Sequence, residues 1–352
     1  MSFGDEETIF GTVENLMKQI FKGTKDIDLE DHFQRMTWHE CMRRYGSDKP
    51  DLRFGNEIQN ISNLFEHTEF KVFKSVLEEK GEINCIKFEN AGDKYSRKAL
   101  DQLQDFVKHG FKAKALAYLK MSETELSGSI AKVLSEDEKQ VLISSLGLKN
   151  NDLVLVIADK PSVSRSALGA LRVRLAHELN LIPEGNVYKF LWVTDFPMFE
   201  YSEEEDRYVA AHHPFTAPNE EDVDKLFTNP AEVNSRAYDL VLNGYELLSG
   251  SIRIHDQDLQ EKVFEAIGMT MEEARKKFGF FLDAFKYGTP PHGGVGIGLE
   301  RLTMLIAGTD NIRDVVAFPT TNSSLDLMSE SPNVVDQAQL DILGIQIKNS
   351  DK

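Results

Sequence analysis

Cysteine, long apolar runs and net positive charge are all scarce in this sequence of 352 residues. Two cysteines occur, Cys41 and Cys85, too few for a disulfide framework or for a zinc site held by cysteines. The longest apolar run has six residues, 153–158, and is too short to cross a bilayer. Residues 1–10 are acidic and lack the basic-then-apolar pattern of a signal peptide. We therefore expect a cytoplasmic protein with no membrane partner.

Acidic residues dominate the charge, because 58 Asp+Glu against 40 Lys+Arg give a formal net charge of −18. This balance argues against a protein that coats nucleic acid without specificity, although a local basic patch could still guide a nucleic acid. Hydrophobic residues make up 41% of the chain and aromatic residues 9%, which excludes a disordered chain and suffices for one or two cores. The length predicts two or three domains.

The spacing of apolar residues divides the chain into three segments. Residues 1–65 alternate helix and loop, and the apolar residues within 9–20 recur at the spacing of one helical face, with no strong N-cap before them. Residues 66–160 alternate strands and helices and could fold by themselves as an inserted αβ domain. Residues 161–352 are dominated by antiparallel strands and turns. Together the segments predict an α+β fold, an antiparallel sheet with helices plus the inserted domain.

Individual elements can be predicted within these segments. In the inserted segment we expect strands at 84–88, 114–120 and 153–157, the last of them buried. Further along, Thr270 with Glu273 forms the pattern of a capping box and predicts the start of a helix there.

The dipeptide Asn243-Gly244 between two apolar runs is a strong hairpin signal. A two-residue loop pairs Val241 with Glu246, so Asp239 lies diagonally from Glu246 on the same face of the sheet. Two converging carboxylates are costly unless a cation lies between them, and Mg²⁺ takes such oxygen ligands together with phosphates. The simpler alternative is two solvated carboxylates on an exposed face, and the spacing by itself favours that alternative.

Arg253 follows Glu246 by seven residues, which in a regular strand places the two side chains on opposite faces. A bulge within Ser249-Gly250-Ser251 could turn Arg253 toward the carboxylates. The guanidinium could then hold a substrate carboxylate bidentately. An ordinary surface ion pair explains the residue equally well.

Residues 294–301, GVGIGLER, alternate glycine with apolar residues. The segment is neither G-x-G-x-x-G nor a P-loop, so it predicts no Rossmann or Walker site. Alternate glycines leave one face of a strand without side chains, so a flat ring can lie against the backbone. Arg301 then opens a helix, where it suits a phosphate or a base. Close packing of the strand against another element is the competing interpretation.

The pair His212-His213 is a weak candidate for a metal site. Adjacent strand residues point to opposite faces, and no further ligand follows at zinc spacing. We expect one ring to belong to the core or scaffold and the other to face a pocket.

Residues 294–301 match the third signature motif of class II aminoacyl-tRNA synthetases. Taken with other segments, they make the chain resemble the bacterial aspartyl-tRNA synthetases of that class from residue 2 to about residue 348. Residues 66–160 resemble the GAD insertion domain of that family. The other matching segments are 44–51, 196–200, 212–216, 243–246, 251–255 and 287–292.

This resemblance implies an aspartate–tRNA ligase, which joins L-aspartate to ATP and passes it to the 3′ end of tRNA(Asp). Whether tRNA(Asn) is also charged stays open, and a homodimer is implied for the complete enzyme. The attacking carboxylate is already ionised, so the first step needs no side-chain base, and catalysis consists of placement and charge stabilisation.

Residue roles follow from the resemblance as expectations. Mg²⁺ on ATP would be held by Asp239 and Glu246, and the side-chain carboxylate of aspartate by Arg253. Glu246 and Arg301 would act in catalysis. The residues expected to border the aspartate pocket are His212 and His213, and those expected to line the adenine and phosphate site are Glu246, Gly298, Leu299, Glu300 and Arg301.

Parts of the family pattern are missing from this sequence. The family begins with an anticodon-binding OB-fold, followed by motif 1 for dimerisation and motif 2 with an ATP-binding arginine. Without them, we expect a C-terminal part of a synthetase with impaired activity. Leu248-Ser249 also stands where bacterial relatives usually have two glycines. Two alternatives stay open: a stand-alone paralogue that adenylates a small carboxylic acid without charging tRNA, and a non-catalytic regulatory protein.

Overall fold

The computed structural model describes residues 1–123 and 125–348. The chain divides into two compact units, Met1–Ile297 and Gly298–Lys352, which are considered separately. Among the described residues, none of the helices combines the length and the apolar character that a membrane span needs. The mixture of mostly antiparallel sheets and helices confirms the predicted α+β class.

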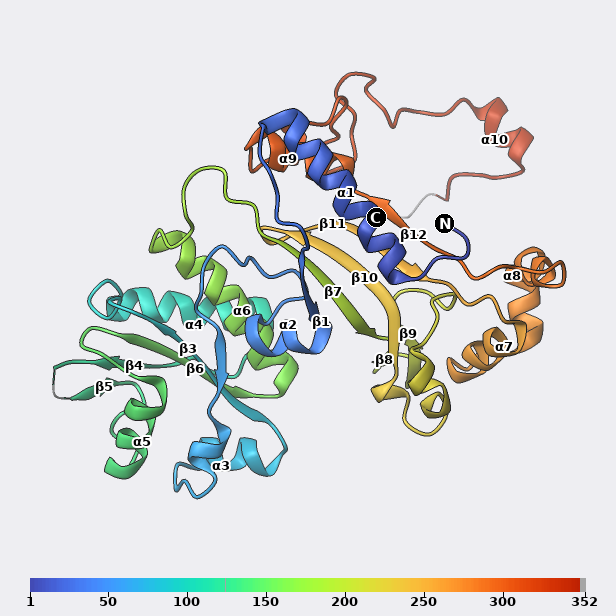
Figure 1. The fold of residues 1–352 in the computed structure, drawn as a ribbon. Coiled ribbons are helices and arrows are strands. Elements are labelled where there is room, and N and C mark those ends of the chain that lie inside the picture. Colours follow the sequence, from blue (N-terminus) through green and yellow to red (C-terminus); the bar gives the residue numbers. More distant parts are fainter. Residues whose placement is uncertain (124, 349–352) are drawn as a thin grey trace. The chain divides into compact units, whose positions relative to one another are not determined.

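The first unit contains two five-stranded sheets, whose strand orders are β1-β7-β10-β11-β12 and β2-β3-β6-β4-β5 (Figure 1). Its helices are α1 (Glu6–Lys25), α2 (Trp38–Tyr45), α3 (Lys71–Glu78), α4 (Arg97–Phe111), α5 (Glu136–Leu146), α6 (Pro161–Glu178), α7 (Gln257–Ala266) and α8 (Met271–Phe285). The strands of the first sheet are β1 (Gln34–Thr37), β7 (Phe190–Pro197), β10 (Asn234–Leu242), β11 (Tyr245–Ile252) and β12 (Gly293–Ile297). Those of the second are β2 (Ile58–Asn60), β3 (Glu82–Phe88), β4 (Ala117–Met121), β5 (Leu126–Gly128) and β6 (Leu153–Asp159). A separate hairpin joins β8 (Phe199–Ser202) to β9 (Arg207–Ala210).

Helix α1 covers one face of the first sheet (Figure 1). The ring of Phe10 stacks on Trp192 with 4.2 Å between centroids, and Ile9 packs against the backbone of Gly293. The predicted apolar helical face is confirmed, but the expected lack of an N-cap is wrong. Asp5 caps the helix, because its carboxylate accepts a hydrogen bond from the backbone N–H of Thr8.

The opposite face of the same sheet is covered over only part of its width. Met36 and Cys41, from β1 and α2, pack with residues of β7 and β10 such as Val193 and Val241. Within the described residues, this cluster includes no side chain from β11 or β12. The part of this face formed by β11 and β12 is therefore where a ligand could lie, and we call it the site face.

The second sheet has a closed, dry core on both of its faces. Helices α4 and α6 pack on one face and α3 and α5 on the other. The strands predicted at 84–88 and 153–157 are confirmed as β3 and β6, and that predicted at 114–120 as the shorter β4. Because β2 at Ile58–Asn60 belongs to this sheet as well, the sheet extends ahead of residue 66. The proposed boundaries at 65/66 and 160/161 stay predictions.

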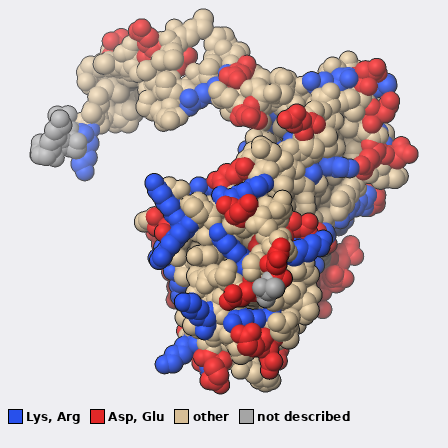
Figure 2. Space-filling view, turned by 90° about the vertical axis from the view of Figure 1, so that its left-hand side faces the viewer, with Lys and Arg blue, Asp and Glu red and all other residues tan. Residues whose placement is uncertain are grey.

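The surface charge of the inserted segment differs from that of the rest of the chain. Residues 66–160 contain 15 Lys+Arg and 16 Asp+Glu, a net charge of −1, so most of the total of −18 lies elsewhere. Figure 2 faces this part of the molecule and shows basic and acidic side chains interspersed over it. On this face, the described residues of the inserted segment form no field of a single sign.

Candidate active site

The hairpin of β10 and β11 carries the predicted carboxylate pair. Leu242 pairs with Tyr245 and Val241 with Glu246, which is the register predicted from Asn243-Gly244. Asp239 lies on the same face as Val241, since strand side chains alternate. The hairpin therefore places Asp239 and Glu246 on one face of the sheet, and their carboxylates interact electrostatically.

A β-bulge changes the register just beyond Glu246. Leu248 pairs with Leu240, so Leu247 is an extra residue in β11. The bulge was expected within Ser249-Gly250-Ser251, and its observed place is a correction. Leu247 and Leu248 are both buried, with 1% exposure each, and the extra residue lets two consecutive leucines enter the core.

The bulge shifts the odd-numbered residues of β11 onto the face of Asp239. Ser249 pairs directly with Asp239, and Ser251 with Ala237. Continuing this alternation places Arg253 on the same side, where a regular strand would have turned it away. The bulge thus turns Arg253 to the side of the carboxylates, as the sequence predicted, but it lies at Leu247 and not within residues 249–251.

Asp239 is a buried carboxyl group with 8% exposure. Burial raises the pKa of Asp239 to about 7, and the negative charges of Glu246 and Asp48 add to this, while a hydrogen bond from Ser249 and the charge of Lys49 oppose it. Ser249 thus stabilises the ionised form of its neighbour. At neutral pH this carboxyl group can bind either a proton or a cation.

Arg253 follows the end of β11 and is half-buried. Its backbone N–H donates to the carbonyl of His292 at 2.9 Å, and Thr216 pairs with it on the other side. Burial lowers the pKa of Arg253. Within the described residues no carboxylate forms an ion pair with this guanidinium. A half-buried guanidinium without an anionic partner is suited to bind an anionic ligand.

Strand β12 presents its glycines toward the site face. Gly294 pairs with Ser251 and Gly296 with Ser249, so both lie on the side of Asp239. A Cβ atom added at Gly294 would meet nothing within 4 Å, whereas one at Gly293, on the α1 side, would lie 2.8 Å from Ile252. The glycines on the site face therefore leave open backbone, and close packing explains only the glycine on the other face.

A cavity of about 420 Å³ lies against this open backbone. It brings together the side chains of Arg253 and His292, the ring of Phe281 and the glycines of β12. Ser249 also lines the cavity and pairs with Asp239. The cavity and the carboxylate pair are therefore neighbours on the same face.

The two adjacent histidines have different surroundings. His212 is exposed and its ring meets Phe196 edge-on at 5.4 Å. The backbone N–H of Phe215 donates to Nδ1 of His213 at 3.2 Å, so the neutral ring carries its proton on Nε2, 3.3 Å from Oγ1 of Thr216. Burial, with Arg253 and His212 nearby, lowers the pKa of His213 to about 4. His213 is the scaffold ring, beside Arg253.

The loop that follows α2 also reaches the carboxylate pair, and the sequence analysis missed it. Asp48 and Lys49 act electrostatically on Asp239, and Asp51 lies against the turn at Gly244, where a Cβ atom would be 3.4 Å from that of Asp51. The loop is held from behind by Arg172 of α6, which is 1% exposed. The Arg172 guanidinium donates at 2.7 to 3.1 Å to backbone carbonyls of Asp51, Phe54, Gly55 and Asn56.

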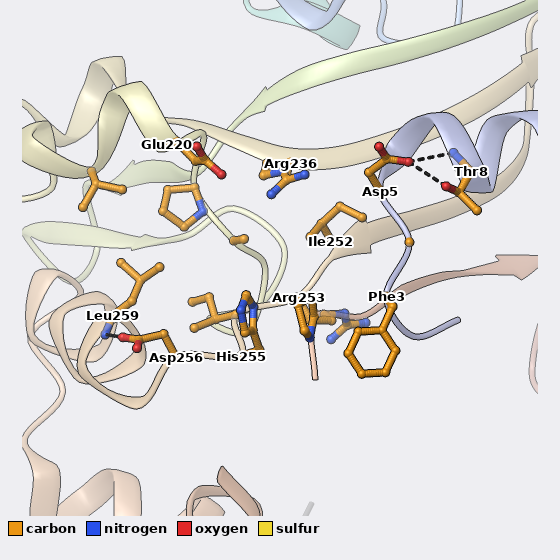
Figure 3. Close-up of a pocket in the computed structure, with 16 residues that line it drawn as sticks. Phe3, Asp5, Thr8, Glu220, Arg236, Ile252, Arg253, His255, Asp256 and Leu259 are labelled. Carbon is orange, nitrogen blue, oxygen red and sulfur yellow. Dashed lines mark hydrogen bonds between the residues drawn. The ribbon is translucent and has the colours of Figure 1, made fainter. Parts of the chain in front are cut away.

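A second cavity of about 510 Å³ lies near the N-terminus of α1 (Figure 3). Its most prominent cation, Arg236, is already neutralised by a bidentate ion pair with Glu6 at 2.7 and 2.6 Å. Asp5 and Asp256 cap helices α1 and α7 there. These groups satisfy one another and hold α1 to β10. Arg253 lines this cavity as well as the smaller one, and only the smaller one also contains the open glycines of β12.

The remaining predicted site residues belong to the second unit. Gly298 is the N-cap of α9 (Leu299–Ala307). Glu300 and Arg301 occupy the first turn of this helix. The unit continues through η4 (Ile312–Asp314) to α10 (Gln337–Leu343). The roles of these residues at a nucleotide stay predictions.

Several known proteins with related names are similar to this chain over nearly its whole length. The aspartate–tRNA ligase of Staphylococcus carnosus is 50% identical over 349 residues, 99% of this chain and 59% of that protein. That of Macrococcus caseolyticus is 50% identical over 354 residues, 100% of this chain and 60% of that protein. The aspartate–tRNA(Asp/Asn) ligase of Anoxybacillus flavithermus is 49% identical over 351 residues, which are 100% of this chain and 59% of that protein. The chain thus spans about three-fifths of the length of these relatives.

A model of the family "tRNA synthetases class II (D, K and N)" matches residues 1–322. This match includes both sheets of the first unit and helix α9 of the second. The chain therefore belongs to the class II tRNA synthetases of the D, K and N group.

Proposed function

We propose that the protein is an aspartate–tRNA ligase that works in the cytoplasm. The observation that carries this proposal is the geometry of the site face, where a guanidinium without an anionic partner among the described residues lies on the side of a carboxylate pair and an open glycine strand. The names of the relatives that cover almost the whole chain support it.

Arg253 is proposed to bind the side-chain carboxylate of L-aspartate. A guanidinium binds a carboxylate with two parallel hydrogen bonds and rejects the neutral amide of asparagine, which cannot replace the charge. His213 holds the segment that pairs with Arg253, through Phe215 and Thr216. We assign to His213 a supporting part in the pocket, and to the more exposed His212 a place at its border.

The carboxylate pair fits Mg²⁺ bound with a nucleotide. Asp239 and Glu246 supply oxygen ligands from one face, and among the described residues no group of three potential ligands forms a complete protein site. Mg²⁺ usually takes one or two carboxylates and completes its shell with waters and phosphates. Bound there, the ion would neutralise phosphate charge. The buried Asp239 carboxyl, with its raised pKa, is a group that a cation would ionise.

The chain's own groups are proposed to place the two substrates. In the first unit, the bare backbone of β12 would receive a flat ring of the substrate. For the second unit, the resemblance to the family implies that Arg301 with Gly298, Leu299 and Glu300 would bind the adenine and phosphates. The α-carboxylate oxygen of aspartate attacks the α-phosphorus of ATP, the bond to the β-phosphate oxygen breaks, and pyrophosphate leaves. A terminal hydroxyl of the tRNA then attacks the aspartyl carbonyl, and AMP leaves. Placement and charge stabilisation carry both steps.

The tRNA partner is proposed to be tRNA(Asp), with tRNA(Asn) as a second candidate. The second candidate is favoured by one relative, whose name includes both tRNAs. A homodimer is proposed for the assembled enzyme from the resemblance to the family.

Two assays test the proposal. Aspartate-dependent exchange of pyrophosphate into ATP measures the first step, and charging of tRNA(Asp) and tRNA(Asn) transcripts measures the second. Exchange with charging is expected. Exchange without charging of either tRNA would favour a stand-alone adenylating enzyme, and absence of both would favour a non-catalytic protein.

A further inference from the structure

Helix α8 has an aromatic inner face that anchors it beside the candidate site. Phe278 and Phe281 meet the ring of Phe215 at centroid distances of 5.1 and 4.7 Å, and Phe278 stacks on Phe264 at 6.0 Å. Phe215 in turn lies 5.9 Å from the ring of His213. The inner face is therefore locked to the segment that flanks Arg253.

The same helix reaches the cavity at two points. Phe281 lines the cavity that contains Arg253, and the loop after α8 ends at His292, which lines it too. Phe280 is the immediate neighbour of Phe281, and Tyr287 lies in the loop that leads to His292. Both residues are thus close in sequence to residues that line the cavity, although they are not part of its lining.

Two aromatic rings are exposed to solvent here, Phe280 on α8, beyond the non-helical residue Phe278, and Tyr287 in the loop after the helix. Phe280 is 81% exposed and Tyr287 90% exposed. The neighbouring Lys276 and Lys277 are exposed, and no ion pair of theirs occurs among the described residues. We call these four residues the α8 rim.

The charge around the α8 rim opposes that of the whole chain. Residues 271–292, from the first residue of α8 to His292, contain four Lys+Arg and three Asp+Glu, a net charge of +1 in a chain of −18. Asp283 is shared by Arg275 at 3.5 Å and Lys286 at 2.6 Å, and Glu273 interacts electrostatically with Lys277. The rim is thus a small positive surface with exposed rings.

Exposed rings beside lysines suit single-stranded nucleic acid. Bases stack on aromatic side chains, and lysines bind the phosphates between them. We propose that the α8 rim binds the single-stranded 3′ end of the tRNA as that end enters the site. This inference rests on the proposed function and adds the surface that would receive the second substrate. A protein partner would need a larger continuous apolar patch than two separated rings provide.

Two double variants with matched controls test the rim. Phe280→Ala with Tyr287→Ala removes both rings, and Phe227→Ala is the control at a ring 54% exposed elsewhere in the unit. Lys276→Ala with Lys277→Ala removes both charges, and Lys71→Ala with Lys74→Ala is the control on the exposed side of α3. For each variant, charging of a tRNA(Asp) transcript is compared with aspartate-dependent pyrophosphate exchange.

The expected result is a selective loss in charging. Stacking contributes about 1–3 kcal/mol per base, so the aromatic variant should lower kcat/KM for tRNA by about tenfold or more relative to its effect on exchange. The lysine variant should reduce the slope of log Kd for the transcript against log salt concentration by about 1.4, since each phosphate contact on a single strand contributes about 0.7. The two controls should change neither quantity.

The outcomes separate the rim from the proposed function. Normal charging by the aromatic variant would overturn the rim. An equal loss in charging and in pyrophosphate exchange would overturn it as well, and would indicate that another protein surface packs on α8. If the wild-type protein shows neither activity, the proposed function fails. The rim is then judged by filter binding of the transcript, where an equal Kd for the aromatic variant overturns it and a raised Kd supports it.

Discussion

The two sheets of the first unit differ in what their central strands bury. In the inserted sheet, Phe88 of β3 and Leu155 of β6 have no exposed surface, and the polar side chains that these strands bury are hydrogen-bonded within the fold: Asn84 donates to Ser164, and Asp159 accepts from the backbone N–H groups of Lys114 and Lys160. In the first sheet, β10 and β11 bury a carboxyl group at Asp239 and pair serines beside it, and β12 presents bare glycines. The inserted sheet is thus packed on both faces, whereas the first sheet leaves open space and unbalanced charge beside β11 and β12.

This difference teaches where stability and chemistry reside. A buried carboxyl group and glycines in strands both cost folding free energy, and they persist only where the rest of the structure compensates. The compensation comes from α1 on one face and from the α2 cluster on part of the other. Substitutions in the inserted sheet should therefore change stability, and those on the site face should change activity.

The largest effect is expected from Phe88→Ala. Phe88 is fully buried within the cluster of the inserted sheet, so truncation should lower the free energy of unfolding by about 3–5 kcal/mol. Urea unfolding followed by circular dichroism measures this. Val72→Ala is the control, because Val72 is 52% exposed in the same segment and its truncation should stay within about 0.5 kcal/mol. Equal effects of the two would contradict the assigned core.

On the site face, Glu246→Gln should change activity rather than stability. Loss of one charged contact to the reacting phosphates should lower the rate of aspartate-dependent pyrophosphate exchange by about 10²–10³. The side chain is only partly buried, so the urea midpoint should stay near that of the wild type. Full activity, or early unfolding, would argue against a metal-positioning role.

Two glycines of the first sheet should respond differently to the same substitution. A Cβ atom at Gly250 would lie 2.1 Å from the carbonyl oxygen of Gly294, so Gly250→Ala must displace β12 and should lower stability by about 1–3 kcal/mol. Gly294→Ala has open space and should leave stability nearly unchanged while raising the KM for ATP. Thermal unfolding and exchange kinetics measure both; a stable Gly250→Ala protein would refute the close approach.

The smallest effect concerns pH. The pKa of His213 is lowered from 6.5 to about 4 in the fold, so below about pH 6.5 the unfolded chain binds a proton that the folded chain does not. The free energy of unfolding should therefore fall by roughly 1–2 kcal/mol between pH 6.5 and 4, after allowance for solvent screening. His213→Gln should remove this part of the pH dependence. An unchanged slope would show that the ring is protonated in the fold.

Local signals in the sequence were sufficient for much of the site. The Asn243-Gly244 turn predicts the pairing of Val241 with Glu246, and hence the shared face of the carboxylates. The capping box at Thr270 and Glu273 is present as well. Each of these depends on residues close together in the chain, where turn and cap geometry leave few choices.

The features that the sequence did not predict depend on distant partners. The bulge lies at Leu247 because two adjacent leucines both enter the core, which a strand pattern does not specify. Arg172 binds backbone carbonyls more than 110 residues away, and carbonyls have no sequence signature. The one signal in the sequence for this contact was the charged residue Arg172 among the apolar positions of α6.

The most direct test of the account is substrate discrimination by Arg253→Leu. Pyrophosphate exchange is measured with aspartate and with asparagine, for the wild type and for the variant. If Arg253 binds the side-chain carboxylate, the wild type strongly prefers aspartate and the variant loses about 2–5 kcal/mol of that preference, because the carboxylate is left without its partner. An unchanged preference in a folded variant would contradict the central claim that the guanidinium on the site face selects the substrate.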